Sequence, residues 1–218
     1  SVPYNAPQHS IVDGTLTLHL ESGLHPLGTI GAHNALNTIG AMELCAQWGI
    51  SNAEFLKAVQ GFTGAAGRLE RKLDITLSTG DCTVFRDFAH APSKVKATTD
   101  SIKGQFTERK LIAILELHTF SSLNPEFLPT YAGALDAADE AWVCWSSDVL
   151  RHKKLPPLSE SDVHAAFGRK DLGTCNSVEE TTAAAQNAAG PNTVVLLMSS
   201  GRFEGADLQG AIQTALDQ

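Results

Sequence analysis

Near its start the chain alternates apolar and polar positions, as a strand with one buried face does. Leu16, Leu18 and Leu20 are each separated by a polar residue, and this period of two is typical of a half-buried strand. Asp13-Gly14 just before them favours a hairpin turn. We therefore predict β-structure over residues 1 to about 30.

From Asn34 onwards the apolar residues recur at helical spacing. The positions concerned are Leu36, Ile39, Met42 and Ala46. Gly49 is a typical residue just past the end of a helix. Ser51-x-x-Glu54 then forms a capping box that opens a second helix, and Gly61 ends it. Residues 31–61 are therefore predicted to form two helices joined by a tight turn.

After residue 80, strand-like and helix-like segments alternate. Strand-like runs cover residues 82–88, 111–117, 141–145 and 193–198. Helices are predicted to begin at Pro92, Ser159 and Ser177, and a last helix spans residues 205–216. This alternation predicts a doubly wound α/β domain with a mostly parallel sheet over residues 80–218. Residues 1–79 are too few and too mixed for such a domain, so we interpret them as the end of another one.

Composition and charge narrow the possible partners. The 218 residues carry 16 Lys and Arg against 24 Asp and Glu, a formal net charge of −8, which argues against a nucleic-acid surface. No apolar run approaches the roughly 20 residues that span a bilayer, so no membrane segment is predicted. The four cysteines form no C-x-x-C pair and are predicted to be small buried residues in a reducing compartment. Because the chain begins at Ser1 without methionine, we expect a piece of a longer protein.

Polar residues follow the predicted strands at their carboxyl ends, where ligands bind in sheets of this type. They are Asp87 and His90 at the first strand, Glu116, His118, Thr119 and Ser121 at the second, and residues 199–205, with Gly201 and Arg202, after the last. A carboxylate such as Asp87 can accept hydrogen bonds from ribose hydroxyls. Free backbone amides beyond Gly201 can bind a carboxylate. A structural role for His90 and for the two later loops remains the alternative.

A second group of candidates precedes the α/β part. Asn34 and Asn37 lie on one predicted helix face beside His33, and carboxamides can pair with a purine edge. A glycine-rich stretch then delivers Arg68, whose guanidinium suits phosphate recognition. The alternatives are that Asn34 caps its helix and that the glycine-rich stretch is a linker. No metal cluster is predicted, and neither G-x-x-x-x-G-K-[ST] nor G-x-S-x-G occurs in the chain.

Taken together and in this order, the segments resemble the Mur ligase family, the ATP-dependent amide ligases of peptidoglycan metabolism. The matches are H-N-x-x-N at residues 33–37, F-x-G-x-x-x-R-x-E at 62–70 and D-[FY]-A-H-x-P at 87–92. The resemblance implies that residues 1–79 end the central ATPase domain and that residues 80–218 form the Rossmann-like C-terminal domain. It also implies a protein of the bacterial cytoplasm.

The resemblance implies roles for the candidate residues. Asn34 and Asn37 would contact the adenine of ATP with His33 beside them, and Asp87 would hold the ribose. Arg68 would approach the phosphates from the hinge, and His90 would lie close by as a second catalytic residue. The peptide pocket would be lined by His118, Thr119, Ser121, Gly201 and Arg202. The P-loop and the Mg²⁺ ligands are expected upstream of Ser1, so we expect no ligase turnover from this chain alone.

Within the family, two segments resemble the murein peptide ligases most. They are E-x-H-T-x-S at residues 116–121 and M-S-x-G-x-F-x-G at residues 198–205. Such enzymes join L-Ala-γ-D-Glu-meso-diaminopimelate to UDP-N-acetylmuramate in peptidoglycan recycling, so this nucleotide sugar and the muramyl tripeptide are the expected partners. The alternatives are a UDP-N-acetylmuramate–L-alanine ligase, a folylpolyglutamate-type ligase, and a non-catalytic α/β module that binds a nucleotide or peptide.

Overall fold

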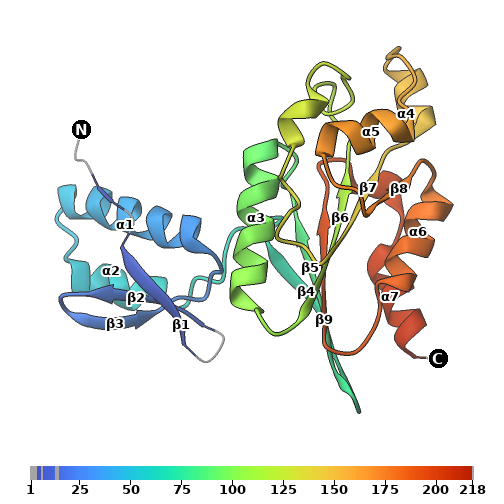
Figure 1. The fold of residues 1–218 in the computed structure, drawn as a ribbon. Coiled ribbons are helices and arrows are strands. Elements are labelled where there is room, and N and C mark those ends of the chain that lie inside the picture. The colour runs from blue at the N-terminus through green and yellow to red at the C-terminus, as the bar shows by residue number, and fades with distance from the viewer. Residues whose placement is uncertain (1–3, 6, 13–14, 218) are drawn as a thin grey trace.

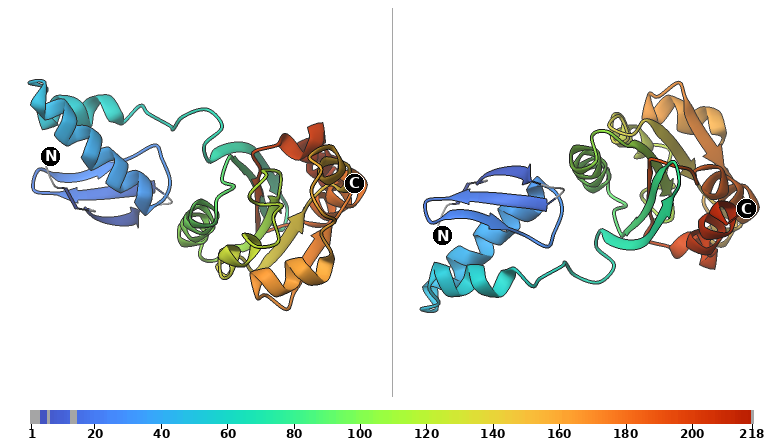
Figure 2. Two further views of the ribbon diagram at one scale, coloured as in Figure 1. Left: turned by 90° about the horizontal axis from the view of Figure 1, so that it is seen from above. Right: turned by 90° about the horizontal axis from the view of Figure 1, so that it is seen from below.

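The chain folds into two units joined by an extended segment (Figure 1). The computed structural model describes residues 4–5, 7–12 and 15–217. The smaller, N-terminal unit is drawn in blue and cyan, and the larger unit runs from green to red. Helix α3 (Pro92–Gln105) lies on the side of the larger unit that faces the smaller one, and both views of Figure 2 agree on this arrangement.

The N-terminal unit packs two helices on a small antiparallel sheet. Its strands β1 (Gln8–Val12), β2 (Thr15–Leu20) and β3 (Gly23–Pro26) lie in that order, and α1 (Ala32–Gln47) and α2 (Asn52–Val59) follow. The core residues are Leu16, Leu18, Leu27, Ala35, Ile39, Met42 and Leu56. This confirms the predicted strand and pair of helices, whereas the predicted turn at Asp13-Gly14 lies outside the described residues.

The start of α1 differs from one of the alternatives considered for Asn34. The helix begins at Ala32 with Gly31 at the N-cap position, so Asn34 already lies in the first turn. Its side-chain amide donates a hydrogen bond of 2.8 Å to the Ile30 carbonyl instead of capping the helix. The predicted capping box of α2 is present, since the Ser51 hydroxyl accepts from the Glu54 amide and the Glu54 carboxylate accepts from the Ser51 amide.

The larger unit is built on a six-stranded sheet with the order β4-β5-β9-β6-β7-β8. Its strands are β4 (Glu70–Leu77), β5 (Gly80–Asp87), β6 (Lys110–Glu116), β7 (Glu140–Cys144), β8 (Leu172–Cys175) and β9 (Thr193–Met198). All neighbours are parallel except β4, which pairs antiparallel with β5. The predicted α/β class and mostly parallel sheet are confirmed.

Strand β4 places the boundary between the two units earlier in the sequence than we expected. We expected the second unit to begin at residue 80, but residues 70–77 pair with β5 and are part of its sheet. Leu73, Ile75 and Leu77 alternate with polar residues there, which is the pattern of an edge strand with one covered face. Because charged residues interrupt this weak alternation next to a glycine-rich stretch, we assigned the segment to the end of the first unit.

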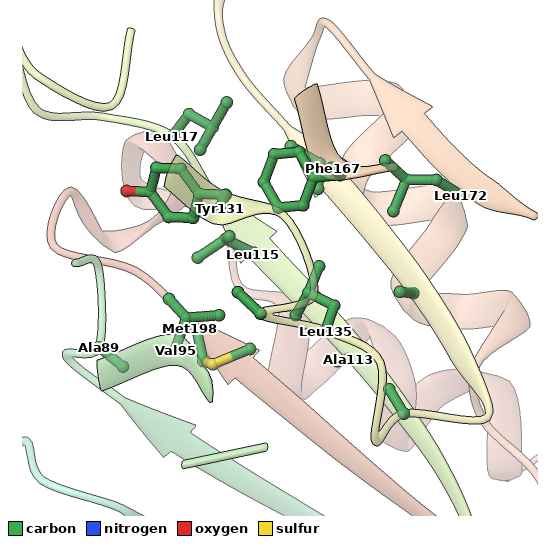
Figure 3. Close-up of a cluster of buried hydrophobic side chains, with 14 of the residues drawn as sticks. Ala89, Val95, Ala113, Leu115, Leu117, Tyr131, Leu135, Phe167, Leu172 and Met198 are labelled. Carbon is green, nitrogen blue, oxygen red and sulfur yellow. The ribbon is translucent and has the colours of Figure 1, made fainter. Parts of the chain in front are cut away.

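Helices cover both faces of the large sheet. On one face lie α3, the short helix η1 (Leu128–Tyr131), α4 (Ser147–His152) and α5 (Glu160–Phe167). On the other lie α6 (Val178–Asn187) and α7 (Leu208–Leu216), with the short helix η2 (Arg202–Gly205) before α7. Along β6, Ala113 and Leu115 pack into the first layer, part of which Figure 3 shows, and Ile112 and Ile114 pack into the second. The continuous apolar run in the sequence is therefore one strand buried on both sides.

The remaining sequence expectations concern cysteines and membranes. All four cysteines are free, and Cys82, Cys144 and Cys175 are buried as predicted. Cys45 is only half-buried because it lies on α1 outside the core of the small unit. Among the described residues, no helix is both long and apolar enough to cross a membrane.

Candidate functional site

A cleft of about 660 Å³ lies where the two units meet. It is lined by α1, the end of α2, the extended segment up to Leu69, the end of β5 and the first turns of α3. The lining includes all of the residues predicted to bind the nucleotide, namely His33, Asn34, Asn37, Arg68 and Asp87. Three motifs that are far apart in the sequence therefore contribute side chains to one cavity.

Asp87 is the most firmly held of these residues. Its side chain is buried at the end of β5, and its Oδ2 accepts a hydrogen bond of 2.6 Å from the Thr98 hydroxyl on α3. Its Oδ1 accepts from the backbone amides of Leu69 at 3.2 Å and Phe88 at 2.7 Å. A carboxylate offers about four acceptor positions, so one remains for a ligand hydroxyl. Asp87 thus ties the segment between the units to the sheet while it still faces the cleft.

Asn34 and Asn37 project from adjacent positions on the first turns of α1. The Asn37 amide donates to the Asn34 Oδ1 at 3.3 Å, while the Asn34 amide donates to the Ile30 carbonyl. Within the described part of the chain, the Asn37 Oδ1 has no hydrogen-bond donor. The pair therefore presents a free acceptor and remaining N–H donors to the cleft, which suits the edge of a purine.

His33 joins α1 to α3 across the same cleft. Its Nδ1 lies 3.3 Å from the Ser101 hydroxyl, and burial lowers the pKa of the imidazole, with nearby Lys94 adding to the effect and Asp87 opposing it. His33 is therefore held in its neutral form more strongly than an exposed histidine.

Two cationic side chains, those of Arg68 and Lys94, line the cleft. The Arg68 guanidinium lies over the ring of Phe88, 5.3 Å from its centre, and within the described structure it forms no ion pair. Lys94 and Ser93, in the first turn of α3, also line the cleft. The sequence analysis missed them, although two polar residues directly after Pro92 at a helix start are a recognisable anion-binding pattern.

The structure does not bring His90 into this cleft. Its Nδ1 lies 2.9 Å from the Phe88 carbonyl, and its ring packs edge-on against Phe88 with 5.2 Å between ring centres. The Tyr131 hydroxyl donates to the His90 carbonyl, and burial raises the pKa of Tyr131 to about 12. The loop after β5 is thereby fixed from the first core layer, with the imidazole turned to its own backbone.

The predicted peptide residues form a second group at the ends of β6 and β9. The buried Glu116 carboxylate accepts from the Ser199 hydroxyl and, at 2.8 Å, from the Phe203 amide. Its Oε1 lies 3.7 Å from the His118 Nδ1, and His118 in turn stacks closely on Gly201. Thus His118 and Gly201 are neighbours. The buried Glu116 carboxylate, to which the sequence assigned no role in the site, holds both loops together.

Thr119 and Ser121 lie in a separate turn of their own. Their hydroxyl oxygens are 3.2 Å apart, and Thr119 also bonds to Ser122 at 2.9 Å. Arg202 lines a smaller pocket and is absent from the lining of the large cleft. The predicted peptide residues therefore share one edge of the sheet without sharing a single cavity.

The loop after β9 has an unusual backbone. Arg202, Phe203 and Glu204 adopt φ angles of 60°, 52° and 53°, a left-handed conformation in which residues with side chains are uncommon. Such a conformation persists only where surrounding contacts determine it, and functional sites are where it is found most often. Here the contact is the hydrogen bond from the Phe203 amide to Glu116.

The donor set suits a nucleotide better than a metal ion. Among the described residues, no three His, Cys, Asp or Glu side chains gather where they could hold a metal. By contrast, the cleft combines carboxamides, a buried carboxylate and two cations, which are complementary to a base, a ribose and phosphates respectively.

Comparisons with known proteins agree with this picture. The family model described as "Mur ligase, glutamate ligase domain" matches residues 67–201. The UDP-N-acetylmuramate–L-alanine ligase of Mycobacterium ulcerans is 30% identical over 201 residues, which is 88% of this chain and 39% of that protein. The enzyme of the same name from Ruthia magnifica is 31% identical over 137 residues, covering 63% of this chain and 27% of that protein. The chain thus spans about two fifths of the length of the first of these relatives.

Solved structures share the fold over nearly the whole chain. The UDP-N-acetylmuramate–alanine ligase of Thermotoga maritima gives a TM-score of 0.68 at 20% identity, covering 96% of this chain and 44% of its own. A murein peptide ligase from Psychrobacter arcticus gives 0.60 at 22% identity with the same coverage. The folylpolyglutamate synthase of Mycobacterium tuberculosis gives 0.58 at 20% identity, covering 98% of this chain and 48% of its own. At these identities the likeness concerns the fold alone.

Proposed function

The chain belongs to the Mur ligase family. We propose that it comprises the C-terminal domain of an ATP-dependent peptide ligase together with the preceding interdomain hinge, and that both parts bind the nucleotide. The observation that carries the proposal is the shared cleft between the units. Side chains from all three ordered motifs line it, among them the carboxamide of Asn37, the carboxylate of Asp87 and the guanidinium of Arg68. The relatives' names add support, since both sequence relatives described above are ligases that act on UDP-N-acetylmuramate.

In this proposal the residues of the cleft bind and orient ATP. Asn34 and Asn37 pair with the adenine edge, and the remaining acceptor position of Asp87 takes a ribose hydroxyl. We assign Arg68 and Lys94, the two cations that line the cleft, to the phosphates, because fixed cations stabilise the charge that moves during phosphoryl transfer. The Asp87 carboxylate also accepts a hydrogen bond from the Leu69 amide, which belongs to the segment between the two units. Binding of a ribose to Asp87 would therefore act directly on that hinge segment.

The chemistry of the reaction follows the family. ATP, when bound, supplies the phosphoryl group that converts the carboxylate of UDP-N-acetylmuramate into an acyl phosphate. The free amine of the peptide then attacks the acyl carbon, a C–N bond forms and phosphate leaves. The residues of this chain position the reactants and offset the negative charge of the phosphates. The positioning contribution depends on how accurately the reacting groups are held together. Mg²⁺ and the P-loop are assigned to a part of the protein beyond these residues, and we place the whole enzyme in the bacterial cytoplasm.

We favour the salvaged tripeptide L-Ala-γ-D-Glu-meso-diaminopimelate as the amine substrate. The support is the E-x-H-T-x-S segment together with the M-S-x-G-x-F-x-G loop, which the structure joins through Glu116. L-Alanine is the second candidate, favoured by the names of the relatives at 30% and 31% identity. A glutamate-adding ligase of the folylpolyglutamate type is a third candidate, and a non-catalytic binding module remains the alternative outside the enzymes.

A substrate panel tests the function. The ligase that contains this chain together with its upstream domains would be given ATP, UDP-N-acetylmuramate and one amine at a time. The amines are the tripeptide, L-alanine and L-glutamate, and phosphate release is the readout. We expect turnover with the tripeptide. Turnover with L-alanine instead would select the second candidate, and no turnover with any amine would contradict the ligase proposal.

Nucleotide binding by the 218-residue chain tests the cleft separately. We expect ADP to bind measurably, and Asn37→Ala to weaken binding about tenfold, since a lost hydrogen bond to a bound ligand is worth roughly 1–1.5 kcal/mol. Gln47→Ala, an exposed position at the far end of α1, is the matched control. The same chain is expected to show no ligase turnover, because it carries no phosphate-binding G-x-x-x-x-G-K-[ST] motif.

A further inference from the structure

A second pocket, of about 280 Å³, lies at the carboxyl ends of β5 and β9. Asp87 lines both this pocket and the large cleft, so the two cavities are neighbours that share a wall. The new pocket is also lined by Arg86, Ser199 and Arg202, and by Glu70 from β4. None of these side chains belongs to the set to which we assign the nucleotide.

The Arg86 side chain lies on the opposite face of the sheet from those of Phe85 and Asp87. Phe85 packs into the first core layer and Asp87 bonds to α3, so the alternation of a strand directs Arg86 to the face that carries α6 and α7. Val84, two residues earlier, is buried in that second layer. The Arg86 guanidinium is half-buried, and within the described structure it has no hydrogen bond and no ion pair.

Arg202 reaches the same pocket from the loop after β9. The loop is fixed in its left-handed conformation by the hydrogen bond from Phe203 to Glu116 and by the bond of 2.8 Å from the Gly201 amide to the Ser199 hydroxyl. The Arg202 side chain is exposed, and like Arg86 it has no partner among the described residues. A strained backbone held by a buried carboxylate therefore presents a free guanidinium.

The acidic residue of the pocket does not neutralise this pair. Glu70 lies opposite Arg86 in the β4–β5 register, but its carboxylate forms an ion pair with Lys72. The hydrogen bond from Lys72 is the main reason that the pKa of Glu70 lies below its usual value. Lys72 offsets the charge of Glu70, and the donors to Asp87 are neutral, so Asp87 keeps its single negative charge. Two arginines against this one carboxylate leave the pocket with an excess of positive charge.

We infer that Arg86 and Arg202 form an anion site that holds a carboxylate of the incoming peptide. Two guanidinium forks from different elements are a fitting receptor for planar oxyanions, and carboxylates and phosphates share that chemistry. A carboxylate is the favoured occupant, because the side chains to which we assign the phosphates of the nucleotide line the neighbouring cleft, whereas Arg86 and Arg202 line only this pocket. This inference rests on the proposed function and deepens it, since two arginines favour a peptide with several carboxylates over L-alanine.

Calorimetric titration of the 218-residue chain tests the site. The probes are the tripeptide L-Ala-γ-D-Glu-meso-diaminopimelate, L-alanine and inorganic phosphate. We expect the tripeptide to bind more tightly than the other two, and both Arg86→Gln and Arg202→Gln to weaken it at least tenfold. Arg86→Lys is expected to fall in between, because it keeps the charge but loses the fork.

The controls separate this inference from the proposed function. Arg151→Gln removes an exposed arginine on α4 that pairs only with Asp148, and it is expected to leave tripeptide binding unchanged. ADP affinity is expected to be the same in Arg86→Gln as in the native chain, whereas loss of ADP binding by the native chain would count against the proposed nucleotide cleft.

Three outcomes would overturn the anion site. One is tripeptide affinity that is equal in the native chain and in both glutamine variants, and another is no tripeptide binding by the native chain at all. The third is phosphate that binds as tightly as the tripeptide and competes with it, which would reassign the arginines to a phosphoryl group. Melting temperatures of the variants within a few degrees of the native value exclude unfolding as the cause.

Discussion

The imidazole of His118 occupies the space that a side chain at Gly201 would need. A Cβ at position 201 would lie 2.6 Å from the His118 Cδ2 and closer still to the Cγ and Nδ1 of the ring. Because residue 118 follows β6 and residue 201 follows β9, this contact joins two adjacent strand ends at the edge where ligands bind. Glycine at 201 is therefore a requirement of packing, and any change there must displace the histidine.

Gly201→Ala is expected to destabilise the fold by about 1–3 kcal/mol, the usual cost of forcing extra atoms into a packed site. The measurement is denaturant unfolding of the purified chain. Gly104→Ala is the matched control, since a Cβ at that position in α3 meets open space and alanine favours a helix by roughly 0.5–1 kcal/mol. Opposite signs for the two variants are expected, and a neutral Gly201→Ala would contradict the contact.

Glu116→Ala tests the buried carboxylate that holds the loop after β9. Its removal leaves the buried Phe203 amide and Ser199 hydroxyl without their acceptor, a loss of about 1–3 kcal/mol per unsatisfied group. We expect lower stability together with faster amide exchange over residues 199–205. Glu126→Ala, an exposed glutamate, should change stability by less than about 0.5 kcal/mol. Unchanged exchange in that loop would show that the strained backbone is held by something else.

Asp87→Asn tests the two roles of this residue, which are the hydrogen bonds that it accepts within the fold and the proposed contact with the ribose of the nucleotide. The carboxamide nitrogen cannot accept the hydrogen bonds that Leu69 and Thr98 donate to the two carboxylate oxygens, so one donor loses its acceptor. We expect a loss of about 1–3 kcal/mol in the free energy of unfolding, together with weaker ADP binding. Asp100→Asn, an exposed residue on the same helix as Thr98, should change neither. Native-like ADP affinity in Asp87→Asn would remove the ribose contact from the proposal.

His33 predicts a dependence of stability on pH. Burial lowers its pKa in the folded chain below the usual 6.5, so the unfolded chain binds the proton more readily. Stability contributed by neutral His33 is therefore present above pH 6.5 and is lost as the pH falls from 6.5 through the lowered folded value. Melting temperatures of the native chain and of His33→Gln between pH 7.5 and 5 check this. We expect the variant to lose less stability on acidification, and parallel curves would contradict it.

The local pattern of the sequence was sufficient for most elements. The run from Leu111 to Leu117 matched β6 because a strand buried on both faces must be apolar at every position. Strand β4 was missed as a strand, since its alternation of Leu73 and Ile75 with charged residues is weak until β5 is known to lie beside it. Helix α1 begins before Asn34 because Gly31 serves as the N-cap, and no side-chain pattern marks that choice.

For the candidate site too, the sequence identified some residues correctly, while the position of others depended on the tertiary structure. The residues that contact the cleft were found from motif order, yet His90 belongs to the same motif as Asp87 and turns away from the cleft. Glu116 was recognised as a polar residue at a strand end but was given no role in the site, because a carboxylate at the end of an apolar run looks like the first exposed residue after a strand. Only the approach of the β9 loop buries it and gives it two donors.

What the amino-acid order alone determined is therefore the set of elements and the residue types at their ends, because these depend on periodicity and backbone preferences within a few neighbours. The strand order was decided by the tertiary structure. Insertion of β9 between β5 and β6 places the loop of Arg202 beside Arg86 and the ring of His118 on Gly201, although more than eighty positions separate the members of each pair. Pairing of distant strands depends on burying both faces of one sheet at once, a condition that no local segment can express.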